Sequence, residues 1–198
     1  PHEWPAFVLC TLSGALFFAS ASGQRSVVKI KMEQTRLIPR IYTISMKGIE
    51  RKIWILVGTR PEVIKQTPVY LACVEKFGGE NVVLIGTGQH RELLEQALAH
   101  FAQLNVKLGF NLDIMKPDQT LTSSSAAVLG GLDRLFRKFK PQWLVAQGDT
   151  TSAAMASVAA FQYGIKVAHN EAGLRSYDLQ NPFPEEANRR MISVMADL

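Results

Sequence analysis

Short apolar runs alternate with segments of helical periodicity along most of the chain. Continuous apolar runs bounded by Gly or polar residues are typical of buried strands, and apolar residues three and four positions apart are typical of amphipathic helices. The predicted strands are "KIWILVG" (52–58), "NVVLIG" (81–86), "PQWLVAQ" (141–147) and "IKVAHN" (165–170), and "FNLDIM" (110–115) is predicted as a short strand or an extended segment. The predicted helices span residues 61–77, 90–104, 118–140, 150–163 and 184–198.

This order of strands and helices predicts an α/β fold. The strands are continuously apolar rather than alternating, which favours a Rossmann-like parallel sheet with helices on both faces. The 198 residues are enough for one domain with a substantial core. The last predicted helix reaches Leu198 with neither a cap nor a helix breaker, so we expect the chain to be cut at that point.

The composition is that of an ordinary globular protein, with 47% hydrophobic and 20% charged residues. The net charge of +5 is confined to one segment: residues 24–52 carry eight Lys or Arg and two Glu, whereas residues 53–198 carry fourteen of each sign. A nucleic-acid-binding protein needs clustered cations. The neutral body therefore disfavours nucleic acid as a partner.

Residues 1–45 form a leader that differs from the body. Residues 6–21 resemble the apolar core of a secretory signal with Ala19-Ser20-Ala21 as a cleavage site, although no basic segment precedes it. Alternatively, the working protein starts at Met46 and the leader is non-native and poorly ordered. We favour the second interpretation, which predicts a body at 46–198 located in the cytoplasm and outside the membrane.

The common cofactor and metal motifs are absent from the sequence. No GxGxxG, Walker loop, GxSxG or HExxH is present, and "HNE" lacks the PCxxC partner of a zinc deaminase. The two cysteines, Cys10 and Cys73, match neither a disulfide framework nor a zinc site. We therefore expect no cofactor and no metal.

Charged residues gather where the predicted strands end. The segments that follow the strands read "GTRPE", "GTGQH", "QGDTTS" and "HNEAGLRS". In open parallel sheets, ligands bind beyond the carboxyl ends of the strands, which lie at one edge. The candidate residues there are Arg60, Lys65, Asp149, Glu171, Glu185 and Glu186.

Structural roles are open for most of these residues. Asp149 is placed to cap the helix that begins near Thr150, and Glu185 and Glu186 are placed to complement a helix dipole from its first turn. His90 and His169 fit a helix cap and a strand end. Glu171 has no helix to cap, because it stands between a predicted strand and Ala172-Gly173.

Five motifs in order carry a resemblance to a known family. "GTRPEVIKQTPV", "TGQHRELL", "QGDTTSA", "EAGLRS" and "PFPEEANRR" together resemble the non-hydrolysing UDP-N-acetylglucosamine 2-epimerases over residues 52–198. Members have a two-domain, glycosyltransferase-B-like (GT-B-like) fold, so the resemblance implies that this chain is the N-terminal half, ending before the second domain. Asn170 departs from the family pattern, in which Val precedes the glutamate.

The resemblance also implies a reaction and residue roles. Bacterial members interconvert UDP-N-acetylglucosamine and UDP-N-acetylmannosamine for cell-surface polysaccharide synthesis, without a cofactor and typically as homodimers. The matching positions imply acid/base roles for Asp149, Glu171 and Glu185, and substrate or UDP contacts for Arg60, Lys65 and Arg175. Gln89 and His90 match a region that some members use for a second, regulatory UDP-N-acetylglucosamine.

Two other functions remain open from the sequence. A hydrolysing relative would release free N-acetylmannosamine and UDP. A catalytically incomplete fragment would bind a sugar nucleotide without chemistry, as the abrupt end at Leu198 suggests.

Overall fold

The computed structural model describes residues 11–12, 15–19, 25–28, 52–88, 106, 108–114, 116 and 118–198. The chain divides into a unit of residues 1–40 with Leu198 and a main unit of residues 41–197. In the first unit, β1 (Thr11–Leu12), β2 (Ala15–Ala19) and β3 (Arg25–Val28) pair as an antiparallel sheet in the order β1-β2-β3.

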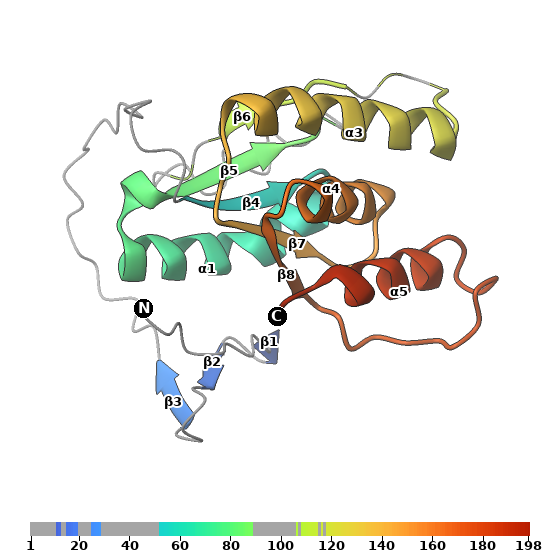
Figure 1. Cartoon of the computed structure of the whole chain (residues 1–198). Coiled ribbons are helices and arrows are strands. Elements are labelled where there is room, and N and C mark those ends of the chain that lie inside the picture. The colour runs from blue at the N-terminus through green and yellow to red at the C-terminus, as the bar shows by residue number, and fades with distance from the viewer. Residues whose placement is uncertain are drawn as a thin grey trace. The chain divides into compact units, whose positions relative to one another are not determined.

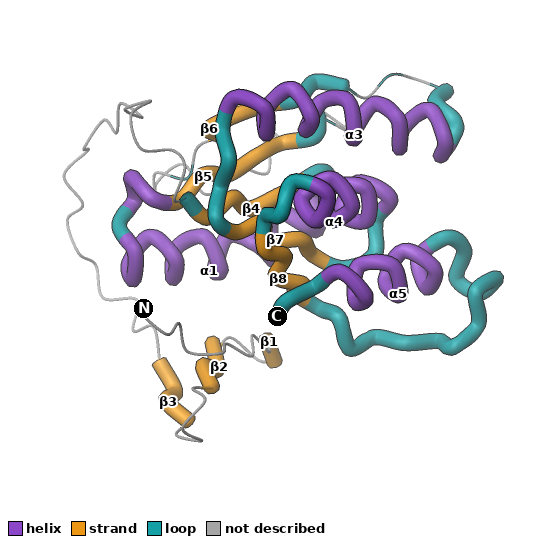
Figure 2. The backbone as a smooth tube through the Cα atoms, in the orientation of Figure 1, coloured by secondary structure: helices purple, strands orange, loops and turns teal. Residues whose placement is uncertain are grey.

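The main unit contains a parallel sheet of five strands among its described residues. The strand order is β6-β5-β4-β7-β8, and every neighbouring pair is parallel. Figure 2 shows these strands side by side. The strands are β4 (Ile53–Val57), β5 (Val82–Gly86), β6 (Leu108–Asn111), β7 (Trp143–Gln147) and β8 (Lys166–Asn170).

Helices cover both faces of this sheet, as the sequence predicts. The described helices are α1 (Arg60–Phe77), the short 3₁₀ helix η2 (Gly79–Asn81), α3 (Leu121–Lys138), α4 (Thr151–Gln162) and α5 (Glu185–Met195). Helices α3, α4 and α5 follow one another in a row (Figure 1) and pack on the face that carries Trp54 and Leu56. Helix α1 packs against β4 and β5, and its buried residues do not belong to that core.

The core on the α3–α5 face is built around aromatic residues. Trp54 is fully buried, and its ring centroid lies 5.4 Å from that of Phe110 and 5.7 Å from that of Phe136. Leu132 on α3 and Ile192 on α5 are also fully buried in this cluster. Such dense packing fixes the helices relative to the sheet, and with them the side chains at the helix ends.

Several predicted boundaries are wrong, and the helix expected at 118–140 spans Leu121–Lys138. The short strand or extended segment expected at 110–115 is a strand at Leu108–Asn111, which pairs with β5 from Leu108 onward. The last helix ends at Met195 rather than at 198, since the Asp197 amide donates to Val167 O at 2.8 Å and its carboxylate accepts from Val167 N. The helix expected at 90–104 lies outside the described residues, as do Gln89 and His90.

In the described part of the chain, none of the helices combines the length and the apolarity that a membrane span requires.

Candidate functional site

The direction in which successive strands are added to the sheet reverses between β4 and β7, which makes this position a topological switch point. Successive strands after β4 proceed to one side as β5 and β6, and the chain then returns to the other side as β7 and β8. Loops at such a point diverge and leave a crevice at the carboxyl edge of the sheet, where ligands of α/β proteins bind. The loops here are Gly58–Thr59, before α1, and Gly148–Thr150, before α4.

Glu62 ties these two loops together. Its Oε2 accepts from the amides of Gly58 at 2.7 Å and Thr59 at 2.6 Å, and its Oε1 accepts from Thr150 Oγ1 at 2.9 Å. Burial raises the pKa of Glu62, although the hydrogen bonds from Thr59, Thr150 and Gly58 lower it in part. Sequence reasoning missed this residue, yet "TRPE" has the spacing of a capping box.

Asp149 does not cap α4, so that interpretation is wrong. Thr150 is the N-cap, and its hydroxyl accepts from Ala153 N at 3.1 Å. The Asp149 carboxylate instead accepts from Nη2 of Arg189, and its main-chain carbonyl accepts from Asn188 Nδ2 at 2.9 Å. Both partners belong to α5.

A cavity of about 450 Å³ lies at the N-terminal ends of α3, α4 and α5. Asp149 and Glu185 both line it, so the structure brings these two predicted acid/base residues together. Glu185 Oε2 is buried and has no hydrogen-bond partner among the described residues. Sequence reasoning missed the α3 side of the cavity, where Lys116, Asp118 and Gln119 contribute.

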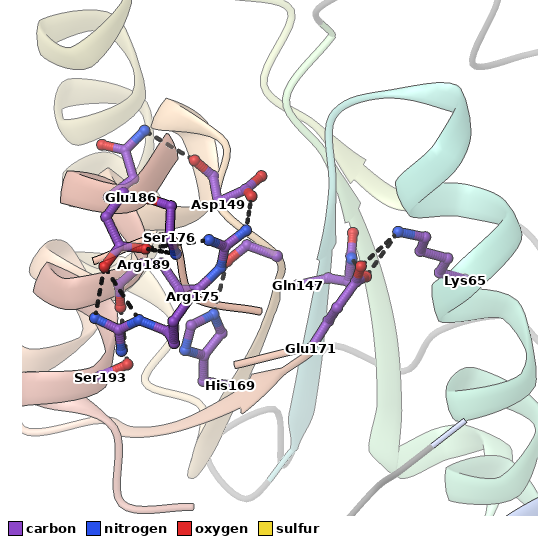
Figure 3. Close-up of polar contacts among 12 residues, drawn as sticks. Lys65, Gln147, Asp149, His169, Glu171, Arg175, Ser176, Glu186, Arg189 and Ser193 are labelled. Carbon is purple, nitrogen blue, oxygen red and sulfur yellow. Dashed lines mark hydrogen bonds and ion pairs between the residues drawn. The ribbon is translucent and has the colours of Figure 1, made fainter. Parts of the chain in front are cut away.

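Glu171 lies apart from this cavity, in a pair with Lys65. Lys65 Nζ is 2.9 Å from Oε1 and 2.7 Å from Oε2 of Glu171, and Gln147 Nε2 also donates to Oε2. Figure 3 shows this group separately from the one around Asp149. Glu171 has φ 63°, a left-handed conformation that non-glycine residues adopt rarely and that recurs at functional sites.

Glu186 is a buried carboxylate surrounded by arginines. Arg190 Nε donates to its Oε1 at 2.8 Å, Arg175 Nη2 donates to the same oxygen at 3.2 Å, and Ser176 N donates to Oε2 at 3.1 Å. The pKa of Glu186 is lowered to about 2, chiefly by the hydrogen bond from Arg190; burial raises it in part, and the contacts with Ser176 and Arg175 lower it further toward this value. Both Glu185 and Glu186 stand in the first turn of α5, as predicted.

The remaining candidate residues differ in their surroundings. His169 is buried with its Nε2 2.7 Å from Gly148 O, and burial lowers its pKa, with the charge of Arg189 acting in the same direction. A neutral His169 therefore donates to this carbonyl at the strand end. Arg60 is exposed at the first position of α1, whereas Arg175 turns its guanidinium toward Glu186.

Comparison with known proteins identifies the family. Residues 74–198 match the family model described as UDP-N-acetylglucosamine 2-epimerase, and a UDP-N-acetylglucosamine 2-epimerase of Campylobacter jejuni is 42% identical over 148 residues. The chain belongs to the UDP-N-acetylglucosamine 2-epimerase family. The matched segment is 75% of this chain and 38% of the Campylobacter protein, so the chain spans well under half the length of such epimerases.

Solved structures of epimerases agree with this assignment. The UDP-GlcNAc 2-epimerase of Neisseria meningitidis, solved with UDP-GlcNAc bound, is 43% identical with a TM-score of 0.67; 73% of this chain and 38% of that chain are covered. The epimerase of Methanocaldococcus jannaschii, solved with UDP-GlcNAc and UDP, is 33% identical with a TM-score of 0.64 and the same coverage. The parallel sheet and its helices therefore match part of the GT-B-like fold of these epimerases, over 38% of their length.

Proposed function

We propose that this chain takes part in the reversible epimerisation of UDP-N-acetylglucosamine to UDP-N-acetylmannosamine at carbon 2. The observation that carries the proposal is the pair of carboxylates, Asp149 and Glu185, on one cavity at the carboxyl edge of a sheet in a member of this family. Epimerases with this fold have been solved with UDP-GlcNAc bound.

The chemistry requires UDP to leave before the proton on carbon 2 is removed. Hydrogen on carbon 2 is not acidic while the anomeric C–O bond is intact, but cleavage of that bond, with both electrons going to UDP, develops an oxocarbenium ion that acidifies it. A carboxylate then removes the proton and leaves a glycal. Return of a proton to the opposite face of carbon 2, and of UDP to the anomeric carbon, completes the inversion.

Such a reaction needs acid/base groups on both sides of the sugar and cations for the diphosphate. We assign the acid/base work to Asp149, Glu171 and Glu185. Glu171 is held in a fixed orientation by Lys65 and Gln147, which suits a group that must meet one carbon atom. General acid–base groups commonly contribute about 10²–10⁴-fold in rate.

We assign the contacts with UDP or substrate to Arg60, Lys65 and Arg175. Arg60 is exposed beside the switch point, where a diphosphate could reach it, and Lys65 is half-exposed on the same helix. Arg175 is paired with Glu186, with its Nη2 3.2 Å from Oε1 of that residue. The proposal extends to a regulatory sugar nucleotide at Gln89 and His90, to a homodimer and to a cytoplasmic location.

Product analysis tests the proposal. The natural protein that contains this chain is incubated with UDP-N-acetylglucosamine, and the products are followed by proton NMR. UDP-N-acetylmannosamine as product supports the non-hydrolysing reaction, whereas free N-acetylmannosamine with UDP assigns the hydrolysing one. Binding without either product would refute an enzymatic role.

A further inference from the structure

Helix α5 holds the carboxylate of Asp149 through Arg189. Nη2 of Arg189 donates to Asp149 Oδ2, and Nη1 of the same guanidinium lies 3.5 Å from Glu186 Oε2. Figure 3 shows the guanidinium between these two acids. Only 6% of the Arg189 side chain is exposed. A buried, planar guanidinium whose two terminal nitrogens both contact carboxylates is confined to one orientation. The carboxylate that accepts its hydrogen bond is oriented in turn.

The anchor of this arrangement is Glu186. Its side chain is 0% exposed, and its oxygens accept from Ser176 N and from the guanidinium groups of Arg175 and Arg190. These donors come from α5 and from the loop after β8. A carboxylate fixed from two segments cannot swing, so Arg189 is held in place when Asp149 is perturbed.

The same helix also fixes the main chain at Asp149 and supplies the second carboxylate of the cavity. Asn188 Nδ2 donates to Asp149 O at 2.9 Å, and Glu185 is the first residue of α5. Helix α5 therefore holds Asp149 in place and also carries Glu185, although the two residues are far apart in the sequence. Proton transfer on a sugar depends on such fixed geometry, and a misplacement of about 1 Å can cost about 10²-fold in rate.

We propose that Arg189, anchored by Glu186, is a positioning residue that fixes the Asp149 carboxylate in the cavity it shares with Glu185. The kinetic consequence rests on the proposed function, whereas the placement of Asp149 does not. Arg190 provides a matched comparison, because it donates to Glu186 but has no contact with Asp149 among the described residues. Without Arg190, Glu186 still accepts from Arg175 and from Ser176 N.

The kinetic test compares Arg189→Met, Arg189→Lys and Arg190→Met in the natural protein that contains this chain. Methionine keeps an apolar stem and removes the charge, so lost packing is limited. We expect Arg189→Met to lower kcat by about 10²-fold with KM nearly unchanged, because the loss falls on the transition state. Arg189→Lys should recover part of kcat, and Arg190→Met, which removes one of three donors to Glu186 and none to Asp149, should lower kcat far less than Arg189→Met. Equal kcat for wild type and Arg189→Met would overturn the proposal.

Crystal structures of Arg189→Met and Arg190→Met give a second readout that does not need activity. We expect the Asp149 carboxylate to leave its position in the first variant and to keep it in the second. An unmoved Asp149 in a folded Arg189→Met protein would overturn the proposal whatever the kinetics. An inactive wild type would refute the proposed function alone, and the two structures would still decide the role of Arg189.

Discussion

Lys65 on α1 and Glu171 after β8 form an ion pair in which the ammonium lies 2.9 Å and 2.7 Å from the two carboxylate oxygens. The side chains are 48% and 28% exposed, and ion pairs at such exposure contribute about 0–1 kcal/mol to stability. The pair joins two segments at the carboxyl edge of the sheet. We infer that its main effect is to orient Glu171 rather than to stabilise the fold.

Glu171→Gln should therefore lower turnover without unfolding the protein. Glutamine keeps the size of the side chain but cannot take a proton from carbon 2, so we expect kcat to fall at least about 10²-fold. Affinity for UDP should stay near normal, which calorimetry would check. Glu75→Gln, the same change at an exposed position near the end of α1, is the control and should leave kcat unchanged. Unchanged turnover in Glu171→Gln would remove Glu171 from the mechanism.

The lowered pKa of Glu186 predicts that the free energy of unfolding decreases in acid. Its pKa falls from 4.5 to about 2 on folding, so its ionised form stabilises the folded state above pH 4.5, and this contribution disappears as the pH falls through about 2. Urea unfolding over this pH range should show the free energy of unfolding falling less steeply in Glu186→Gln than in wild type. Identical pH slopes in both proteins would contradict the assignment.

The hydrogen bond between Glu62 and Thr150 predicts that loss of the α4 cap destabilises the protein more than loss of the α3 cap. Thr150→Val removes the cap of α4 and also takes a donor from the buried Glu62 carboxylate. Thr120→Val removes the cap of α3, where the hydroxyl accepts from Ser123 N. A lost cap costs about 0.5–2 kcal/mol, and a buried polar group left without a partner costs about 1–3 kcal/mol more. Thermal or urea unfolding should rank Thr150→Val as the more damaging, and equal losses would disprove the link.

The core on the α3–α5 face gives a prediction independent of function. Leu132 on α3 is 0% exposed in the cluster around Trp54, so Leu132→Ala should lower the free energy of unfolding by about 2–5 kcal/mol. Leu121 at the start of the same helix is 48% exposed. Leu121→Ala should change stability by no more than about 0.5 kcal/mol. Similar losses for both variants, measured by urea unfolding, would be inconsistent with this packing.

The strands of the main sheet could be predicted because they are buried on both faces and read as continuous apolar runs. The boundary at β6 could not, because half-buried residues such as Leu108 and Phe110 give a weak pattern whose limits depend on pairing with β5. The strand order, and with it the switch point between β4 and β7, depends on tertiary packing that periodicity does not record.

The sequence predicted which residues belong to the candidate site better than it predicted how they are arranged in space. Strand ends and motifs drew attention to Asp149, Glu171 and Glu185, yet only Asp149 and Glu185 line the cavity. Glu186 was open to interpretation as a first-turn acid, and its burial among arginines arises from contacts between the loop after β8 and α5. Side-chain partners that are distant in sequence, such as Arg189 and Asp149, leave no signal in a single sequence.

Removal of the proton on carbon 2 is the step on which the proposed mechanism depends, and isotope exchange measures it directly. The natural protein that contains this chain is incubated with UDP-N-acetylglucosamine in D₂O, and deuterium at carbon 2 is followed by NMR and mass spectrometry. We predict deuterium at carbon 2 of both epimers with wild type, and a strong decrease with Glu171→Gln. Formation of UDP-N-acetylmannosamine that retains its original hydrogen at carbon 2 would contradict the mechanism.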